Sequence, residues 1–213
     1  MFFQLTDLLT CPRCGPTHGL ILLAQQVKDR RVQRGWLGCP HCRTDYPVTD
    51  GVADLRLDPA ADRQPGPLLE EEDLALKIVA LSGLAEERGY LLLDERLAHV
   101  ADAVARLAPD LEVISVKPAP DGFRGGRGVS RILSEVRFPL VEYRLRAVAI
   151  APAGDQELVA AAARRVAAGG RLLLFDAGDV DLKEVKASGL VIVAAEGGTA
   201  VAERKIEPKV GLG

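Results

Sequence analysis

Two pairs of cysteines constrain the fold of this chain more than any other feature. They are Cys11-Pro-Arg-Cys14 and Cys39-Pro-His-Cys42, the four cysteines of the sequence, and 24 residues separate the pairs. Two intervening residues let both sulfurs of a pair reach one ion, and Zn²⁺ prefers a tetrahedron of four thiolates. We therefore predict one structural Zn²⁺ per chain, bound by Cys11, Cys14, Cys39 and Cys42. A redox-active Cys-x-x-Cys motif and a pair of disulfides remain the alternatives.

The segment between the cysteine pairs predicts a small β-hairpin. Residues 19–24 (GLILLA) and 32–37 (VQRGWL) have the pattern of two short strands. A unit of this size cannot bury a sufficient apolar core, so the metal supplies folding free energy on the order of 10 kcal/mol. His18 and His41 stand nearby in the sequence. Because four thiolates already satisfy the ion, we expect neither histidine to be a ligand.

The residues after the second pair carry a further motif. They read CPHCRTDYPVTDGVADLR, with Tyr46-Pro47-Val48, Asp50-Gly51-Val52 and a closing strand to Arg56. Together with the cysteines, this run resembles the zinc ribbon of the small activator protein that binds tRNA, rRNA and release-factor methyltransferases. It also resembles the N-terminal domain of bacterial rRNA guanine methyltransferases. The resemblance covers residues 1–57 and implies a structural ribbon with a protein partner, either a methyltransferase or another translation-related protein.

A proline-rich stretch separates this ribbon from the rest of the chain. The run LDPAADRQPGP has three prolines from Pro59 to Pro67, which remove backbone donors and resist helix or sheet. The apolar run at residues 20–23 predicts an edge through which the ribbon docks on the second domain. We expect a zinc ribbon at residues 1–57, a linker at 58–68, an α/β domain at 69–207 and a tail at 208–213.

From residue 69 onward, helical and strand patterns alternate. Apolar residues recur at helical spacing in three segments, which are residues 74–84, 97–107 and 156–168. Short apolar runs between them predict buried strands at residues 89–94, 111–116, 146–150 and 171–175. Strands separated by helices imply a Rossmann-like, mostly parallel sheet with helices on both faces. Residues 190–205 predict a final antiparallel hairpin that turns at Gly197-Gly198.

This order of elements, closed by a hairpin, resembles class I S-adenosylmethionine-dependent methyltransferases. The run Ala168-Gly169-Gly170-Arg171 stands where that family turns from a helix into its fifth strand. The resemblance covers roughly residues 69–207. It implies a nucleoside cofactor at the carboxyl ends of the first strands, where glycines let the backbone approach the ligand.

Three features that this cofactor or its chemistry needs are missing. The first strand is followed by Asp94-Glu95-Arg96-Leu97, which keeps the acids but has no glycine. The second strand ends Val116-Lys117-Pro118, without an acid for the ribose. The loop at residues 151–154 lacks the Asn-Pro-Pro-aromatic motif of amino-group methylation. Asp94 and Glu95 are the candidate cofactor-binding residues, and no residue is assigned a catalytic role.

The interval between the second strand and the strand at residues 146–150 is also short. Residues 118–144 leave little room for the strand and two helices that usually stand there, so the domain looks trimmed. This interval holds Arg124, Arg127 and Arg131, which are candidates for contact with RNA phosphates. A solvated surface loop is the alternative.

Composition limits the other functions. The net charge of −3 and an aromatic content of 4% give the chain as a whole no character of a nucleic-acid binder. No apolar run reaches the roughly 18 residues of a membrane span, and the first residues lack the pattern of a secretory leader. We therefore expect a cytoplasmic protein that binds no membrane.

The sequence as a whole predicts a zinc-binding protein with a degenerate, non-catalytic methyltransferase-like domain. Such a domain would act as a protein-binding or scaffold module, and we expect it not to bind S-adenosylmethionine. The alternative is an S-adenosylmethionine-dependent RNA methyltransferase with a divergent cofactor pocket. Fold resemblance alone does not decide between the two, because one fold hosts many activities.

Overall fold

The structure, a computed structural model, describes residues 1–60, 67–84, 88–117 and 126–206. The strands of the amino-terminal part are β1 (Thr10–Cys11), β2 (Gly15–Gly19), β3 (Ile21–Lys28), β4 (Arg31–Gly38), β5 (Asp45–Thr49) and β6 (Val52–Asp54). The later strands are β7 (Gly89–Leu93), β8 (Leu111–Lys117), β9 (Val129–Leu133), β10 (Leu145–Ile150), β11 (Val166–Leu174), β12 (Val191–Glu196) and β13 (Thr199–Glu203). The helices are η1 (Phe3–Leu8), α1 (Leu74–Ser82), η2 (Glu95–Val100), α2 (Ala101–Leu107), α3 (Gln156–Arg165) and α4 (Asp179–Ala187).

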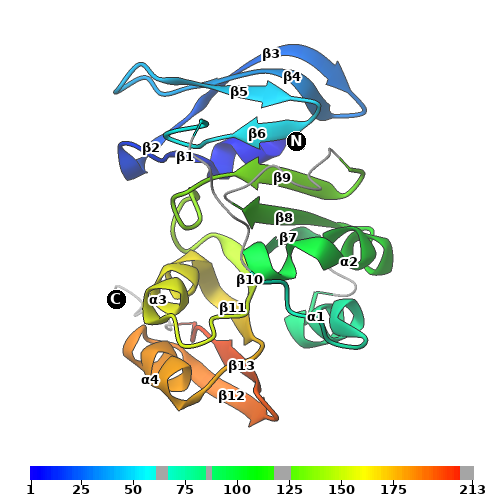
Figure 1. The fold of residues 1–213 in the computed structure, drawn as a ribbon, viewed down its shortest axis with the longest axis vertical. Helices are drawn as coiled ribbons and strands as arrows, with labels where there is room; N and C mark the ends of the chain where they lie inside the picture. The colour runs from blue at the N-terminus through cyan, green and yellow to red at the C-terminus, as the bar shows by residue number, and fades with distance from the viewer. Residues whose placement is uncertain (61–66, 85–87, 118–125, 207–213) are drawn as a thin grey trace, which may run out of the picture.

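One mixed sheet of eleven strands runs through the described residues. Its order is β12-β13-β11-β10-β7-β8-β9-β6-β5-β4-β3, and Figure 1 shows the strands stacked along the long axis of the molecule. Strands β1 and β2 form a separate two-stranded sheet. We call residues 1–57 the ribbon and the part from α1 to β13 the α/β unit.

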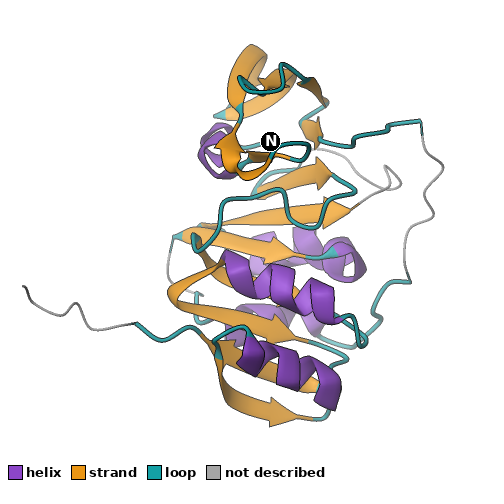
Figure 2. Cartoon of the chain, turned by 90° about the vertical axis from the view of Figure 1, so that its left-hand side faces the viewer, coloured by secondary structure: helices purple, strands orange, loops and turns teal. Residues whose placement is uncertain are grey.

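The α/β unit has the sheet that the sequence predicts. Strands β7, β8, β9, β10 and β11 pair in parallel, and the hairpin of β12 and β13 adds to β11 in antiparallel fashion. Helices cover both faces of this part of the sheet (Figure 2). The prediction of a Rossmann-like, mostly parallel sheet with a final antiparallel hairpin is therefore confirmed.

The apolar strands form because both of their faces are buried. Leu91 and Leu93 of β7 pack in a cluster with α1 and α2, whereas Leu92 packs in the cluster on the opposite face, with α3 and α4. Successive side chains of a strand point to opposite faces, so a strand between two helical layers must be apolar throughout. This explains why β7 reads GYLLL without alternation.

The ribbon continues the same sheet. Strands β3, β4, β5 and β6 pair in antiparallel fashion, and β6 then pairs in parallel with β9, opposing Val52 to Arg131 and Asp54 to Leu133. The expected docking edge at residues 20–23 is wrong, because Ile21 and Leu23 are 56% and 60% exposed on the outermost strand. The ribbon is joined to the α/β unit by the backbone pairing of β6 with β9, on the side of the ribbon away from β3.

Strand β9 occupies part of the short interval between β8 and β10. All five of its residues are buried, and it lies between β8 and β6. The third parallel strand is therefore present in the interval 118–144, whereas residues 126–144, the part of it that the structure describes, contain no helix. Residues 118–125 of that interval lie outside the described residues, and so do residues 61–66 of the predicted linker and the tail 208–213. The described parts of the linker, residues 58–60 and 67–68, form no helix or strand.

Candidate functional site

The four cysteines come together as the sequence predicts. Their Sγ atoms all lie within 4.8 Å of one another, and no other group of three or more potential ligands is found among the described residues. Cys11 and Cys42 are 3.6 Å apart, and Cys14 and Cys39 are 3.8 Å apart. Two turns place them, one between β1 and β2 and one between β4 and β5. This cluster can hold a metal ion.

Polar neighbours surround the cysteine cluster. The Tyr46 hydroxyl lies 3.5 Å from the sulfur of Cys11, and the Thr44 hydroxyl lies 3.3 Å from that of Cys42. Hydrogen bonding to Thr44 lowers the pKa of the Cys42 thiol to about 6. His41 contacts the sulfur of Cys14 at 3.4 Å, and its ring lies 4.4 Å from that of His18. The histidines therefore stand next to the cluster, and the expectation that neither is a ligand stays a prediction.

Asp94 lies at the carboxyl end of β7, where this fold type binds ligands. Its carboxylate accepts hydrogen bonds from the backbone N–H groups of Leu97, at 3.1 Å, and Ala151, at 2.8 Å. The residue is 3% exposed, and burial raises its pKa to about 6, against the two hydrogen bonds that lower it. Asp94 thus ties the start of η2 to the loop after β10.

Arg96 closes the same end of the sheet. Its guanidinium donates to the backbone oxygen of Ala151 and to the carboxylate of Asp176, both at 3.0 Å. The next residue, Leu97, is fully buried. The other candidate, Glu95, is half-buried in the first turn of η2. Side chains of η2 therefore cover the carboxyl ends of β7, β10 and β11.

The arginines predicted to contact RNA have different surroundings. Arg131 is 6% exposed and forms an ion pair with Asp102 at 2.6 Å. Arg127 is exposed, and Arg124 lies outside the described residues. Contact of these arginines with RNA stays a prediction.

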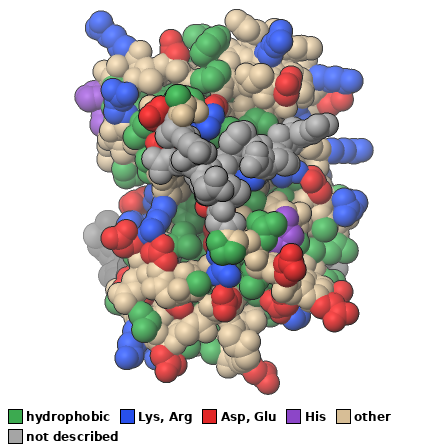
Figure 3. Space-filling view, viewed as in Figure 1, with side chains coloured by type: hydrophobic (Ala, Val, Ile, Leu, Met, Phe, Trp, Pro, Cys, Tyr) green, Lys and Arg blue, Asp and Glu red, His purple; other side chains and the backbone are tan. Residues whose placement is uncertain are grey.

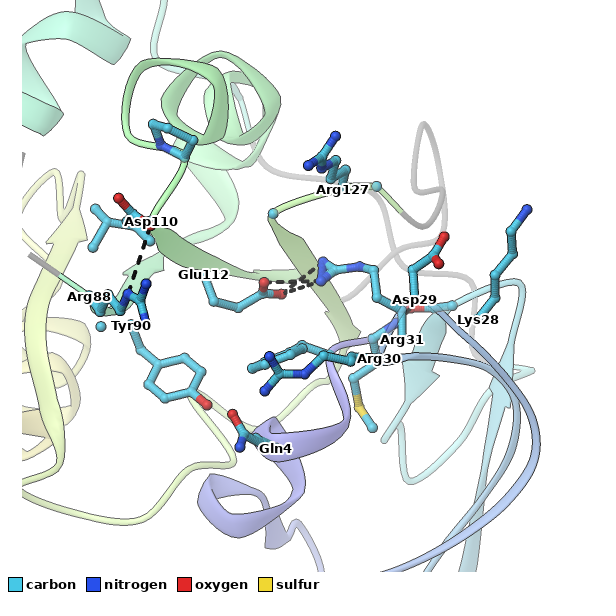
Figure 4. Close-up of a pocket in the computed structure, with 18 of the residues that line it drawn as sticks. Gln4, Lys28, Asp29, Arg30, Arg31, Arg88, Tyr90, Asp110, Glu112 and Arg127 are labelled. Carbon is cyan, nitrogen blue, oxygen red and sulfur yellow. Dashed lines mark hydrogen bonds and ion pairs between the residues drawn. The ribbon is translucent and has the colours of Figure 1, made fainter.

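A cavity that the sequence did not reveal lies at the opposite end of the sheet. It has a volume of about 1270 Å³ and opens between the ribbon and the amino ends of β7 and β8. Its lining includes the turn of the β3–β4 hairpin, at residues 28–31, and the turn before β9, at residues 126–128 (Figure 4). In the sequence, only the basic run Lys28-Asp29-Arg30-Arg31 pointed toward this cavity. Folding brings that run close to the turn at residues 126–128.

A half-buried ion pair joins the two walls of this cavity. Arg31 of the ribbon donates to both carboxylate oxygens of Glu112 in β8, at 2.9 to 3.1 Å, and to the backbone oxygen of Val129. The Ser130 hydroxyl donates to the same carboxylate and accepts from the N–H of Phe2. Burial raises the pKa of Glu112, and Ser130 and Arg31 oppose that shift. Charge-assisted bonds thus join the two units beside their shared backbone pairing.

Comparisons with known proteins agree with this fold. No protein-family model matches the chain, and no curated protein matches its sequence. Precorrin-6y C5,15-methyltransferase from Geobacter metallireducens is 14% identical, with a TM-score of 0.50 over 65% of this chain and 91% of that one. The T. thermophilus 16S rRNA N2 G1207 methyltransferase is 22% identical, with a TM-score of 0.44 over 70% of this chain and 46% of that one.

A third similar structure is 1,6-didemethyltoxoflavin-N1-methyltransferase from Burkholderia thailandensis. It is 15% identical, with a TM-score of 0.43 over 63% of this chain and 78% of that one. The structural neighbours are class I S-adenosylmethionine-dependent methyltransferases, and the match at a TM-score of 0.50 shows their fold in this chain. None of the helices in the described part of the chain has the length and apolar character needed to cross a membrane.

Proposed function

We propose that this chain is a zinc protein whose methyltransferase-like unit is non-catalytic and serves as a scaffold, and whose ribbon binds a protein partner. The observation that carries the proposal is the closed carboxyl end of the sheet. A nucleoside cofactor bound there needs close approach of the backbone and room for its ribose and methionine. Arg96 and Leu97 fill that place with side chains, and Arg96 is held between Ala151 and Asp176.

The buried carboxyl of Asp94 supports the same proposal. In an open site this acid would face a ligand or water. Here its oxygens accept hydrogen bonds from the N–H groups of Leu97 and Ala151, and the residue is only 3% exposed. Opening the site would break both hydrogen bonds and expose the buried side chain of Leu97 to water, at a cost of several kcal/mol.

The proposed zinc fits the cysteine cluster. Four sulfurs at Zn–S distances of about 2.3 Å form a tetrahedron with edges of roughly 3.8 Å. The two opposed pairs in the cluster, at 3.6 and 3.8 Å, agree with this value. Cys11, Cys14, Cys39 and Cys42 would hold the ion, which leaves no ligand position for a substrate. The zinc would then stabilise the ribbon and take no part in catalysis.

The proposed partner surface is the outer face of β3 and β4. Leu23 pairs directly with Trp36, and Ile21 lies two residues before Leu23 on the same side of the strand. Their exposed fractions are 60%, 42% and 56% respectively. Leu22 and its partner Leu37 point to the other side, and Leu37 is fully buried. An apolar face of this kind next to an open sheet edge favours a protein partner.

Affinity purification tests this part of the proposal. We expect the full-length, zinc-loaded chain to retain one partner from its native host, and a Leu23→Ser, Trp36→Ser variant to lose it. A matched control is the double change of Leu76 and Val193 to Ser, since these residues are also exposed and lie on α1 and β12. Equal retention by both variants, or no partner at all, would contradict the proposed surface.

An RNA methyltransferase with a divergent pocket is the second candidate. It is favoured by the completeness of the parallel sheet, which includes β9. This candidate requires cofactor binding, whereas the scaffold proposal excludes it, so calorimetry with S-adenosylmethionine separates the two.

A further inference from the structure

The outer face of β3, β4 and β5 carries one charge at each end of an apolar centre. Leu23, Trp36 and Pro47 pair across the three strands and form the centre. Arg34 lies two residues before Trp36 on β4, so its side chain points to the same face at one end. Asp45 lies two residues before Pro47 on β5, which runs in the opposite direction, so it marks the other end. Figure 3 shows hydrophobic, basic and acidic side chains close together at the top of the molecule, over β3 and β4.

Neither of these two charges is paired within the described chain. Arg34 and Asp45 are both exposed, and no ion pair to either one is found among residues 1–60, 67–84, 88–117 and 126–206. An exposed charge beside an apolar surface can stay in water until a partner of opposite charge arrives. The two residues are therefore available to select what covers the apolar centre.

Gly38 determines where the Asp45 carboxylate lies. Gly38 pairs with Asp45 and stands two residues after Trp36 on β4. A Cβ atom at Gly38 would lie only 2.9 Å from Asp45 Oδ1, so the carboxylate occupies the space over β4 that a side chain would fill. The two charges thus lie over the same strand, each roughly 7 Å along it from Trp36, on opposite sides.

A two-fold axis at Trp36 brings these charges onto one another. The axis runs parallel to the sheet and perpendicular to β4, and it places a second copy face to face with the first at the usual spacing of about 10 Å between packed sheets. Leu23 and Trp36 of one copy then meet Leu23 and Trp36 of the other. Arg34 of each copy meets Asp45 of the other, because the two charges lie at equal distances from the axis. Such an isologous interface forms both ion pairs from one surface.

The open edge of β3 is less suited to a partner than this face. The pairing of β3 with β4 shifts register between Ala24 and Gln26 and again between Gln26 and Val27. Irregularities of this kind twist an edge strand and interrupt the row of backbone groups with which an added strand would pair. A partner therefore contacts the side chains of the face rather than the backbone of the edge.

The size of the face sets the expected strength of the contact. Strands β3 and β4 have eight residues each. The face thus measures roughly 26 Å by 15 Å, which gives about 400 Å² for each copy and about 800 Å² for the pair. Stable interfaces of standard size bury about 1,600 Å² in total, so this one belongs to the weak, concentration-dependent class.

We propose that the outer face of β3, β4 and β5 binds a second copy of this chain, in a two-fold dimer centred on Trp36 with an Arg34–Asp45 ion pair at each end. The inference rests on the partner surface of the proposed function and names its occupant. Any other protein would need an apolar strip with an acid and a base at the matching spacing, whereas this chain supplies that pattern to itself.

Sedimentation equilibrium of the full-length, zinc-loaded chain tests the dimer. Over a range of about 1 to 300 μM we expect a monomer–dimer equilibrium with a Kd on the order of 10 μM. Trp36→Ser should weaken it by about tenfold or more, because it removes the apolar centre. Leu76→Ser, which changes an exposed apolar residue on α1, is the matched control and should leave the equilibrium unchanged. Circular dichroism and zinc content show that each variant is folded.

Charge reversal tests the two-fold arrangement itself. Arg34→Asp alone and Asp45→Arg alone each place like charges together at both ends of the interface, so each should weaken the dimer by about tenfold. A mixture of these two variants should form a mixed dimer about as readily as the wild type, because every reversed charge then meets its opposite. Arg106→Asp and Asp7→Arg reverse exposed charges on α2 and η1, and mixing them should give no such gain.

Three results would overturn the inference. They are a chain that stays monomeric over the whole concentration range, a dimer that Trp36→Ser leaves intact, and charge-reversed variants that do not recover on mixing. Failure of the proposed function looks different. A monomer that retains another protein through Leu23 and Trp36 overturns only the second copy as occupant, whereas binding of S-adenosylmethionine overturns only the scaffold proposal.

Discussion

Replacement of Asp94 by Asn tests whether the carboxyl end of the sheet is sealed. Burial raises the pKa of Asp94 from 3.8 to about 6. A shift of about two units corresponds to about 3 kcal/mol of proton-linked free energy. Because the folded chain binds this proton more tightly than the unfolded chain does, the stabilisation is complete below pH 3.8. It is lost as the pH rises through about 6.

The assay is urea unfolding of the wild type and of Asp94→Asn at about pH 4 and about pH 7. The variant cannot ionise at this position. Its amide also leaves one backbone N–H without an acceptor, which lowers the free energy of unfolding by an amount that does not depend on pH. The stability of the wild type relative to the variant should therefore fall by up to about 3 kcal/mol between the two pH values. Asp7→Asn, at an exposed site, is the matched control.

Two results would refute the reasoning on Asp94. A difference that stays constant with pH would mean that the carboxyl is hydrated and the end of the sheet is open. A difference that grows toward neutral pH would mean that the N–H groups of Leu97 and Ala151 outweigh the burial of the charge.

Two further predictions concern the metal and the junction between the units. Cys39→Ser should lower the zinc content from one equivalent to almost none and unfold the ribbon, as measured by elemental analysis and circular dichroism; full retention of zinc would contradict the ligand set. Glu112→Ala should destabilise the chain by about 2 kcal/mol in urea, because it leaves the half-buried Arg31 without its carboxylate. Arg88→Ala, which removes an exposed and loose pair with Asp110, should change stability by less than about 0.5 kcal/mol.

Local patterns explain why much of the fold could be predicted. The cysteine spacing needs only two turns and an ion, and the cluster forms as expected. The apolar runs of β7 and β10 and the Gly197-Gly198 hairpin carry their own signals of burial and turning. The helix expected at residues 156–168 ends at Arg165, where β11 begins, because element ends depend on tertiary context.

The parts that were missed depend on contacts between distant segments. Strand β9 follows a glycine-rich run that masks its pattern, and it is fixed by pairing with β8 on one side and β6 on the other. The ribbon docks through β6, which is only three residues long and has no apolar run to mark it. The cavity needs the hairpin turn at residues 28–31 to meet the start of β8, about eighty residues later in the chain.

The central claim is that the methyltransferase-like unit has lost its cofactor. Isothermal titration of the full-length, zinc-loaded chain with S-adenosylmethionine and S-adenosylhomocysteine tests it most directly. The sealed end formed by Asp94, Arg96 and Leu97 predicts no binding of either compound up to about millimolar concentration. Binding of either one in the micromolar range would contradict the claim and would favour an active methyltransferase.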